Sequence, residues 1–259
     1  MEPTLKQIES LALAAGKILR GKFGGEITVT RKGVIDLVTE VDQESEVFLV
    51  REIRSQYPHH RIITEEQGEL GGDDSRVWYI DPLDGTVNYA HGVPIFSVSI
   101  AYAKLGEVIL GVIYDPIRNE LFSAQGGVGA WLNGSPIRVS TTETIDQSLL
   151  ATGFPYDIRT NPDNNLDHFE ALTLSSRGVR RLGSAAIDLA YVAAGRLDGY
   201  WEINISTWDI AAGGIIVSEA GGKVTDVKGM DDYLTPNPSL LATNSHIHSQ
   251  ILSVLDRNR

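Results

Sequence analysis

Two aspartates follow the apolar stretch VWYI in a pattern that can bind a cation. The segment DPLDGTVN occupies residues 81–88. Asp and Pro at its first two positions favour a β-turn, which would bring the Cα atoms of Asp81 and Asp84 within ~7 Å. Two carboxylates that close repel each other unless a cation lies between them. Gly85 and Thr86 could then begin a helix, whose free N–H groups favour a phosphate. At this point a plain turn and a charged reaction centre both remain open.

Other acidic residues stand where secondary-structure elements begin or end. Glu65 and Glu66 follow the strand-like RIIT as Asp81 follows VWYI. Ordinary surface charge explains a glutamate pair, yet ligands gather at strand ends in α/β sheets. Asp42 ends DLVTEVD, and Asp209 opens the helical TWDIAAGG. Helix capping is sufficient to explain these two aspartates.

Glu202 lies in YWEI, a strand-like segment in which aromatic residues flank the acid. Burying a carboxylate without a partner is costly, so its position requires an explanation. The histidines are scattered without a zinc-binding spacing. The segment GKILRGKF, residues 16–23, resembles a phosphate-binding loop but has Phe where Ser or Thr is needed, and its pattern is helical.

Composition narrows the classes of function. The chain has 259 residues, a net charge of −12 and no cysteine. An acidic balance argues against nucleic acid or an anionic membrane as partner. The absence of cysteine excludes disulfides, thiolate zinc sites, iron–sulfur clusters and a cysteine nucleophile. An acidic protein with an anionic substrate needs a bound cation to overcome the repulsion.

The N-terminal segment carries charged residues before its apolar ones, which is not the order of a signal peptide. No uncharged apolar run approaches the ~20 residues that a membrane helix requires. We therefore expect a soluble, cytoplasmic protein.

Periodicity predicts mixed α/β structure. A helix with a capping box at Thr4 is expected to end near residues 24–25, and a second helix spans about 42–56. For the second helix we expect the inward residues to be Val47, Val50, Ile53 and Tyr57. Residues 96–139 alternate as an antiparallel meander, and strands and helices alternate after that. We expect two layered lobes, residues 1–143 and 144–259, with the meander and most candidate ligands in the first.

Several long segments occur in the order of one known family. They are DLVTEVD, ITEE, WYIDPLDGTVNYAHG, GSAAIDLAYVAAGRLDGYWE and WDIAAGGIIVSEAGG. Over essentially the whole chain the sequence resembles the inositol monophosphatase family of magnesium-dependent, lithium-sensitive phosphatases. The patterns W-x-x-D-P-x-D-G-T-x-N and W-D-x-A-A-G are long and specific. The resemblance implies an α/β fold, the five-layer αβαβα sandwich of the inositol monophosphatase and fructose-1,6-bisphosphatase type, and a homodimer.

The resemblance also implies roles for individual residues. The implied metal ligands are Glu65, Asp81, the main-chain carbonyl of Leu83, Asp84 and Asp209. The implied catalytic residues are Glu65, Thr86 and Asp42, of which Asp42 and Thr86 orient and activate the attacking water. The implied substrate-binding residues are Asp84, Gly85, Thr86, Ala185, Glu202 and Asp209. Glu202 would contact the hydroxyl groups of a polyol.

The chemistry of this set agrees with those roles. All the side-chain ligands are carboxylates, which suits Mg²⁺ rather than zinc or copper. Glu65 would serve one ion, Asp84 and Asp209 another, and Asp81 would bridge the two. Two such ions ~3.5–4 Å apart can bind phosphate, activate water and stabilise the departing alkoxide, and the resemblance implies two or three Mg²⁺ ions.

The sequence therefore predicts hydrolysis of myo-inositol monophosphate, a small phosphorylated polyol, with neither nucleic acid nor membrane as partner. Fructose 1,6-bisphosphate, histidinol phosphate and 3′-phosphoadenosine nucleotides are alternative substrates. A silent regulatory protein that binds metal and a phosphorylated ligand, or a structural calcium site, are alternatives without catalysis.

Overall fold

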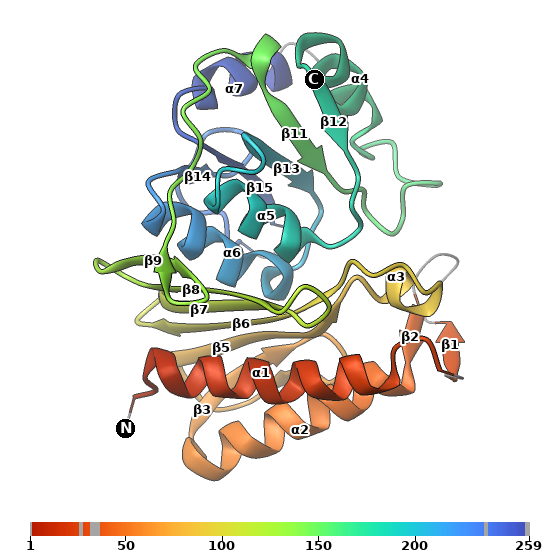
Figure 1. Ribbon diagram of the computed structural model, residues 1–259, viewed down its shortest axis with the longest axis vertical. Helices are drawn as coiled ribbons and strands as arrows, with labels where there is room; N and C mark the ends of the chain where they lie inside the picture. The colour runs from red at the N-terminus through yellow and green to blue at the C-terminus, as the bar shows by residue number, and fades with distance from the viewer. Residues whose placement is uncertain (1, 26–27, 32–36, 236–237, 257–259) are drawn as a thin grey trace.

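In the computed structural model, helices and sheets alternate in five layers (Figure 1). The structure describes residues 2–25, 28–31, 37–235 and 238–256. The layers are, in order, α1 (Leu5–Lys22) with α2 (Glu40–Gln56), an eight-stranded sheet, α5 (Ala185–Ala193) with α6 (Thr207–Glu219), a five-stranded sheet, and α4 (Leu166–Ser175) with α7 (His248–Asp256). This arrangement confirms the expected αβαβα sandwich. No helix in the described ranges is both long and apolar enough to cross a membrane.

The larger sheet has the strand order β10-β9-β8-β7-β6-β5-β3-β4. Its strands are β3 (His60–Thr64), β4 (Gly68–Leu70), β5 (Asp73–Asp84), β6 (Ser97–Lys104), β7 (Glu107–Asp115), β8 (Glu120–Gln125), β9 (Gly129–Leu132) and β10 (Ser135–Pro136). From β5 to β10 each strand pairs antiparallel with the next, which confirms the predicted meander. Strand β3 instead pairs parallel with β5, with Thr64 opposite Ile80. Glu65, the first residue after β3, and Asp81, which is still within β5, are therefore side by side.

The DPLD segment forms a bulge in a strand, so the prediction of a β-turn at these residues is wrong. Asp81 pairs with Ser99 and Asp84 with Ser97, so one extra residue lies on β5 between the two pairs. Such a bulge bends the strand and redirects its side chains. Pro82 lies within the bulge, where its missing N–H breaks no ladder hydrogen bond. The bulge leads into the short helix α3 (Thr86–Ala90).

The smaller sheet has the strand order β12-β11-β13-β15-β14. Its strands are β11 (Leu149–Thr152), β12 (Gly178–Arg180), β13 (Gly199–Ile203), β14 (Lys223–Thr225) and β15 (Ser239–Thr243). A separate pair, β1 (Val29–Arg31) and β2 (Leu37–Thr39), precedes α2. Helix α6 from the C-terminal half packs on the larger sheet, and one apolar cluster joins the two halves. The division into lobes at residue 143 stays a prediction.

Helix α2 begins where expected but presents a different face to the core. Thr39 and Asp42 form the capping box at its start. Val47, predicted to face inward, is 58% exposed. The buried residues of the helix are Val41, Asp42, Ser45, Glu46, Leu49 and Ile53. The prediction for Val47 is wrong because three polar side chains occupy the inward face, which apolar periodicity cannot show. Asp36, in the same segment of the sequence, lies outside the described residues.

Small residues allow α6 to lie close to its neighbours. A Cβ atom at Gly111 in β7 would lie 2.8 Å from the carbonyl oxygen of Ala212 in α6. A Cβ atom at Gly213 would lie 2.4 Å from Cδ1 of Leu189 in α5. Real Cβ atoms do not approach so closely, so side chains at these positions would push α6 away. The glycines therefore help to determine where the N-terminus of α6 lies.

Candidate active site

Acidic side chains from five elements meet in one pocket between the two sheets. The acidic residues in its lining are Glu65, Asp81, Asp84, Asp188, Glu202 and Asp209. Leu83, Gly85, Thr86 and Ala185 line it as well. The structure thus brings together almost all the predicted site residues, and Asp42 reaches the pocket through a hydrogen bond with Thr86. Their roles as ligands and catalysts stay predictions.

Asp81 lies at the centre of the acidic group. Its side chain is buried, and its Oδ1 accepts a hydrogen bond of 2.9 Å from the N–H of Leu83. Burial raises the pKa of Asp81 well above its usual value, and the charges of Glu65, Asp84 and Asp209 raise it further. Because carboxylates so close together repel each other, a bound cation would stabilise their ionised forms.

Asp84 connects the bulge of β5 to the start of α5. Its Oδ2 accepts hydrogen bonds from Ser184 Oγ at 2.5 Å and from the Ala186 N–H at 2.8 Å, and its Oδ1 accepts one from the Ala185 N–H at 3.2 Å. Burial raises the pKa of Asp84, while these hydrogen bonds oppose the rise. The side chain therefore satisfies the N-terminal N–H groups of a helix 101 residues further along the chain.

Asp209 both caps the start of α6 and lines the pocket, so the capping interpretation and a place in the site are both correct. Its Oδ2 accepts a hydrogen bond of 3.1 Å from the N–H of Ser206, which completes a capping box at the start of α6. It also lines the pocket beside Asp84. Burial raises its pKa to about 8, and the charge of Asp84 is the second cause. Capping therefore orients this carboxylate in the pocket rather than excluding it from the site.

Asp42 and Thr86 form a connected pair. Thr86 Oγ1 lies 2.8 Å from Asp42 Oδ1 and 3.1 Å from the carbonyl oxygen of Leu83, so its single hydroxyl proton can be donated to either. Thr39 donates its N–H and its hydroxyl to the other carboxylate oxygen of Asp42. Burial raises the pKa of Asp42, and the bonds from Thr39 and Thr86 oppose the rise. These hydrogen bonds fix the orientation of the Asp42 carboxylate and of the Thr86 hydroxyl.

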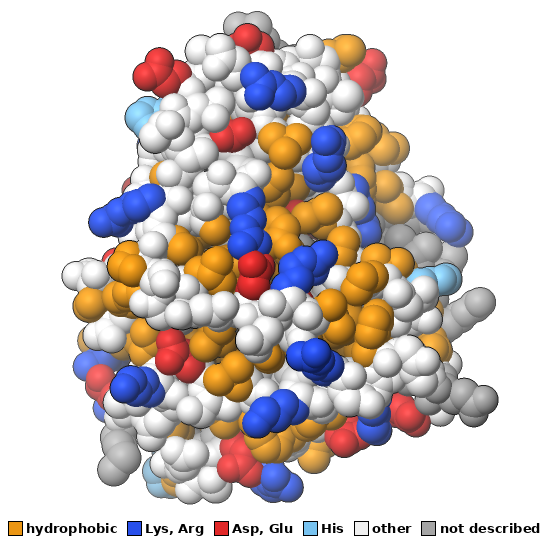
Figure 2. All heavy atoms as spheres, in the orientation of Figure 1, with side chains coloured by type: hydrophobic (Ala, Val, Ile, Leu, Met, Phe, Trp, Pro, Cys, Tyr) orange, Lys and Arg blue, Asp and Glu red, His pale blue; other side chains and the backbone are white. Residues whose placement is uncertain are grey.

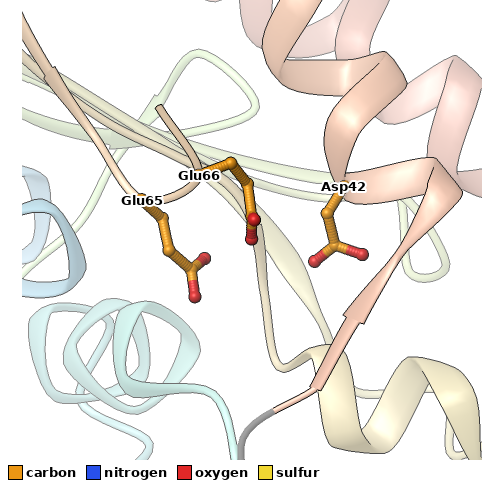
Figure 3. A group of neighbouring side chains, drawn as sticks. All are labelled: Asp42, Glu65 and Glu66. Atoms are coloured by element: carbon orange, nitrogen blue, oxygen red, sulfur yellow. The ribbon is translucent and has the colours of Figure 1, made fainter. Parts of the chain in front are cut away.

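Glu66 is a neighbour that the sequence interpretation did not assign to the site. Oxygen atoms of Asp42, Glu65 and Glu66, one from each residue, all lie within 4.8 Å of one another (Figure 3). Figure 3 shows Glu65 and Glu66 on the loop after β3 and Asp42 on the first turn of α2. In the sequence, its position directly after Glu65 was the signal that could have assigned Glu66 to the site.

Glu46, which the sequence interpretation missed altogether, holds the loop that carries this pair. Its Oε2 accepts hydrogen bonds from Thr64 Oγ1 at 2.5 Å and from the Glu66 N–H at 2.8 Å. Its Oε1 accepts one of 2.9 Å from the Gln67 N–H. The side chain is 1% exposed, so both oxygens are used within the protein. No local pattern distinguishes Glu46 from the exposed acids of the same helix.

Glu202, on β13, also lines the pocket. The hydroxyl of Tyr200 donates a hydrogen bond to its Oε2, and burial raises its pKa to about 7. Gly153 lies against the same carboxylate, since a Cβ atom there would be 2.1 Å from Oε2. Tyr200 and Gly153 therefore fix the position of this acid in the pocket.

The donor set fits a divalent cation that prefers oxygen. Asp81, Asp84 and Asp209 are buried or half-buried, and none forms an ion pair with a Lys or Arg of the described part of the chain. Carboxylate and carbonyl oxygens are the ligands of Mg²⁺ and Ca²⁺. The face drawn in Figure 2 carries several Lys and Arg side chains among apolar and acidic ones.

Comparison with known proteins identifies the family. The model of the inositol monophosphatase family matches residues 1–259. The chain belongs to the inositol monophosphatase family. An inositol-1-monophosphatase of Synechocystis is 47% identical over 247 residues, which cover 94% of this chain and 85% of that protein. The protein of Escherichia coli named Nus factor SuhB is 43% identical over 98% of this chain and 96% of its own.

Solved structures of inositol monophosphatases have the same fold. The inositol monophosphatase of Anabaena (Nostoc) has a TM-score of 0.89 and is 46% identical, over 98% of this chain and 96% of that one. The enzyme of Thermotoga maritima has a TM-score of 0.88 and is 38% identical, over 98% and 96% of the two chains. As a member of this family, the protein is a metal-dependent phosphatase that acts on a small phosphorylated substrate.

Proposed function

We propose that this inositol monophosphatase family member hydrolyses myo-inositol monophosphates to inositol and phosphate with bound Mg²⁺. The observation that carries the proposal is the meeting of Glu65, Asp81, Asp84 and Asp209 in one pocket that Glu202 also lines. The first four would hold cations, and the fifth presents a carboxylate to hydroxyl groups. A phosphorylated polyol has both a phosphate for the bound cations and hydroxyl groups for Glu202.

The proposed ligands of Mg²⁺ are the four carboxylates and the carbonyl oxygen of Leu83. Burial raises the pKa values of Asp81, Asp84 and Asp209, and the charges of neighbouring carboxylates raise those of Asp81 and Asp209 further, which indicates a site that gains stability from positive charge. When bound, the ions supply the positive charge that holds the phosphate, activates water and stabilises the leaving alkoxide.

The residues of the chain position the other reactants. The Thr86 hydroxyl donates a hydrogen bond to Asp42, which leaves the oxygen of Thr86 free to accept a hydrogen bond from a water molecule. Gly85 has φ of +98°, and a Cβ atom there would lie 3.0 Å from the Ile95 carbonyl oxygen. Only glycine adopts this conformation without strain, so the backbone beside Thr86 stays open to a phosphate. We assign the substrate hydroxyls to Glu202, and we expect Ala185, which lines the pocket, to contact the substrate as well.

The relatives named Nus factor SuhB make a binding role the alternative to catalysis. The complete set of carboxylates favours catalysis over a silent regulatory protein. A silent member would have no use for the Asp42–Thr86 pair in addition to the acidic ligands. A structural calcium site would not need a polyol-facing acid such as Glu202.

One panel of substrates tests the proposal. Phosphate release from myo-inositol 1-phosphate should require Mg²⁺, stop with EDTA and decrease with Li⁺, with a higher kcat/KM than release from fructose 1,6-bisphosphate, histidinol phosphate or a 3′-phosphoadenosine nucleotide. Asp84→Asn and Asp209→Asn should abolish turnover, with thermal melting to confirm folding. A higher kcat/KM for a nucleotide or bisphosphate would refute the substrate, and full Mg²⁺-dependent turnover in both folded variants would refute the ligands. Light scattering tests the proposed homodimer separately.

A further inference from the structure

Asp188 is a buried acid in the pocket with an unsatisfied oxygen. It lies in the first turn of α5, lines the pocket and is 1% exposed. Its Oδ1 is buried and forms no hydrogen bond within the part of the chain that the structure describes. Buried polar atoms are usually paired, and leaving one unpaired costs free energy.

Helix capping does not explain this acid. The N–H of Ile187 is bonded to Ser184 Oγ, and the N–H groups of Ala185 and Ala186 are bonded to Asp84. The start of α5 is therefore satisfied without Asp188. Asp198, a buried acid near the same sheet, shows the usual arrangement, because its two oxygens accept bonds from Ser140 Oγ and the Leu149 N–H.

Asp188 and Glu202 form two parts of one polar wall. Tyr200, which donates to Glu202, is also within the electrostatic influence of Asp188. Burial raises the pKa of Asp188 well above its usual value, and the charges of Asp84 and Glu202 raise it further, while Arg181 opposes the rise. A carboxyl group in its neutral form both donates and accepts hydrogen bonds, as a hydroxyl group does.

We propose that Asp188 is a substrate-contacting residue that hydrogen-bonds a ring hydroxyl of the polyol which Glu202 does not reach. Glu202 and Asp188 would then bind different hydroxyls of the same ring, from β13 and α5 respectively. A ring hydroxyl of such a substrate would give the unsatisfied Oδ1 a partner, so the site would favour polyol phosphates over phosphates without hydroxyl groups. This inference rests on the proposed function.

The test compares two substrates in matched variants. The readout is the ratio of kcat/KM for myo-inositol 1-phosphate to kcat/KM for p-nitrophenyl phosphate, with Mg²⁺. Asp188→Leu keeps a similar shape without hydrogen-bonding groups and should lower this ratio about tenfold. Asp188→Asn keeps hydrogen-bonding groups and should stay within about threefold of the wild type. Asp198→Asn is the control, because it perturbs a buried acid outside the pocket and should leave the ratio unchanged.

The outcomes separate the two proposals. Wild-type protein that hydrolyses neither ester with Mg²⁺ would overturn the proposed function, and this inference with it. Wild-type protein that hydrolyses both, with an unchanged ratio in folded Asp188→Leu, would overturn the role of Asp188 alone. If Asp188→Leu fails to fold, Asp188→Ala is judged by the same ratio. A second measurement uses monodeoxy derivatives of inositol 1-phosphate, each of which lacks one ring hydroxyl. The derivative that lacks the hydroxyl bound by Asp188 should be hydrolysed equally by the wild type and by Asp188→Leu. If no such derivative is found, the proposed contact is refuted.

Discussion

Replacing Glu202 by Gln should stabilise the metal-free protein above neutral pH. Glu202 is 8% exposed, and burial raises its pKa from 4.5 to about 7. Folding therefore favours the protonated acid, and the ionised acid destabilises the folded state. Gln resembles the protonated acid, and its amide oxygen can still accept the hydrogen bond from Tyr200.

The expected size follows from the two pKa values. A tenfold change in a proton equilibrium corresponds to about 1.4 kcal/mol, so the rise from 4.5 to about 7 corresponds to about 3 kcal/mol. Because the folded pKa is raised, the stability contributed by the protonated group is fully present below pH 4.5 and is lost as the pH rises through about 7. Relative to Glu202→Gln, the wild type should lose about 3 kcal/mol between pH 4 and pH 8.5.

Urea unfolding in EDTA at several pH values measures this difference. Glu143→Gln, which changes an exposed glutamate, is the control and should follow the wild type at every pH. A difference between wild type and Glu202→Gln that varies by less than about 1 kcal/mol across the range would refute the reasoning. Because Glu202 is also our proposed polyol contact, the more stable variant should hydrolyse inositol 1-phosphate less efficiently, which is a common cost of stabilising an active site.

Three further predictions concern positions around the site and in the C-terminal half. Because the Thr225 hydroxyl donates to the Asp226 carbonyl, we assign neutral His248 a hydrogen bond accepted from Thr243 and one donated to Thr225. Burial lowers the pKa of His248 to about 4, so the wild type should lose up to about 3 kcal/mol relative to His248→Gln as pH falls from 6.5 through 4. Urea unfolding measures this loss, with exposed His246→Gln as control. Glu46→Gln places an NH₂ group against an N–H donor, so it should cost about 1–3 kcal/mol in thermal melts and raise the Mg²⁺ concentration for half-maximal activity. An unchanged Mg²⁺ requirement would contradict the role given to Glu46, and Glu44→Gln, on the exposed side of α2, is its control. Gly153→Ala should lower kcat/KM for inositol 1-phosphate at least about tenfold by displacing the Glu202 carboxylate, and kinetics within twofold of the wild type would show that the carboxylate can move without loss.

Structure that depends on neighbours in the sequence could be predicted well. The capping box at Thr4, the N-cap at Ser184 and the start of α6 at Asp209 depend on residues three or four positions apart. The meander also follows from short turns between alternating strands. The two long segments around Asp81 and Asp209 were sufficient to predict the family and its fold.

Burial and strand register required the tertiary structure. Val47 matched the helical period yet is exposed. The buried face of α2 instead carries Asp42 and Glu46, whose carboxylates accept hydrogen bonds from Thr86 and from the loop after β3. The DPLD segment has the composition of a turn, but pairing with β6 holds it as a bulge. Neither outcome can be derived from the segment alone, because both depend on a partner strand or layer.

The sequence by itself determined which acids are present, which elements carry them and in which order. Only the tertiary structure decided which acids meet. The parallel register of β3 and β5 places Glu65 beside Asp81, and the N-terminus of α5 satisfies Asp84 without help from Asp188. The physical reason is that an unpaired oxygen has a cost only where water is excluded, and exclusion of water is a property of the packed layers rather than of any segment.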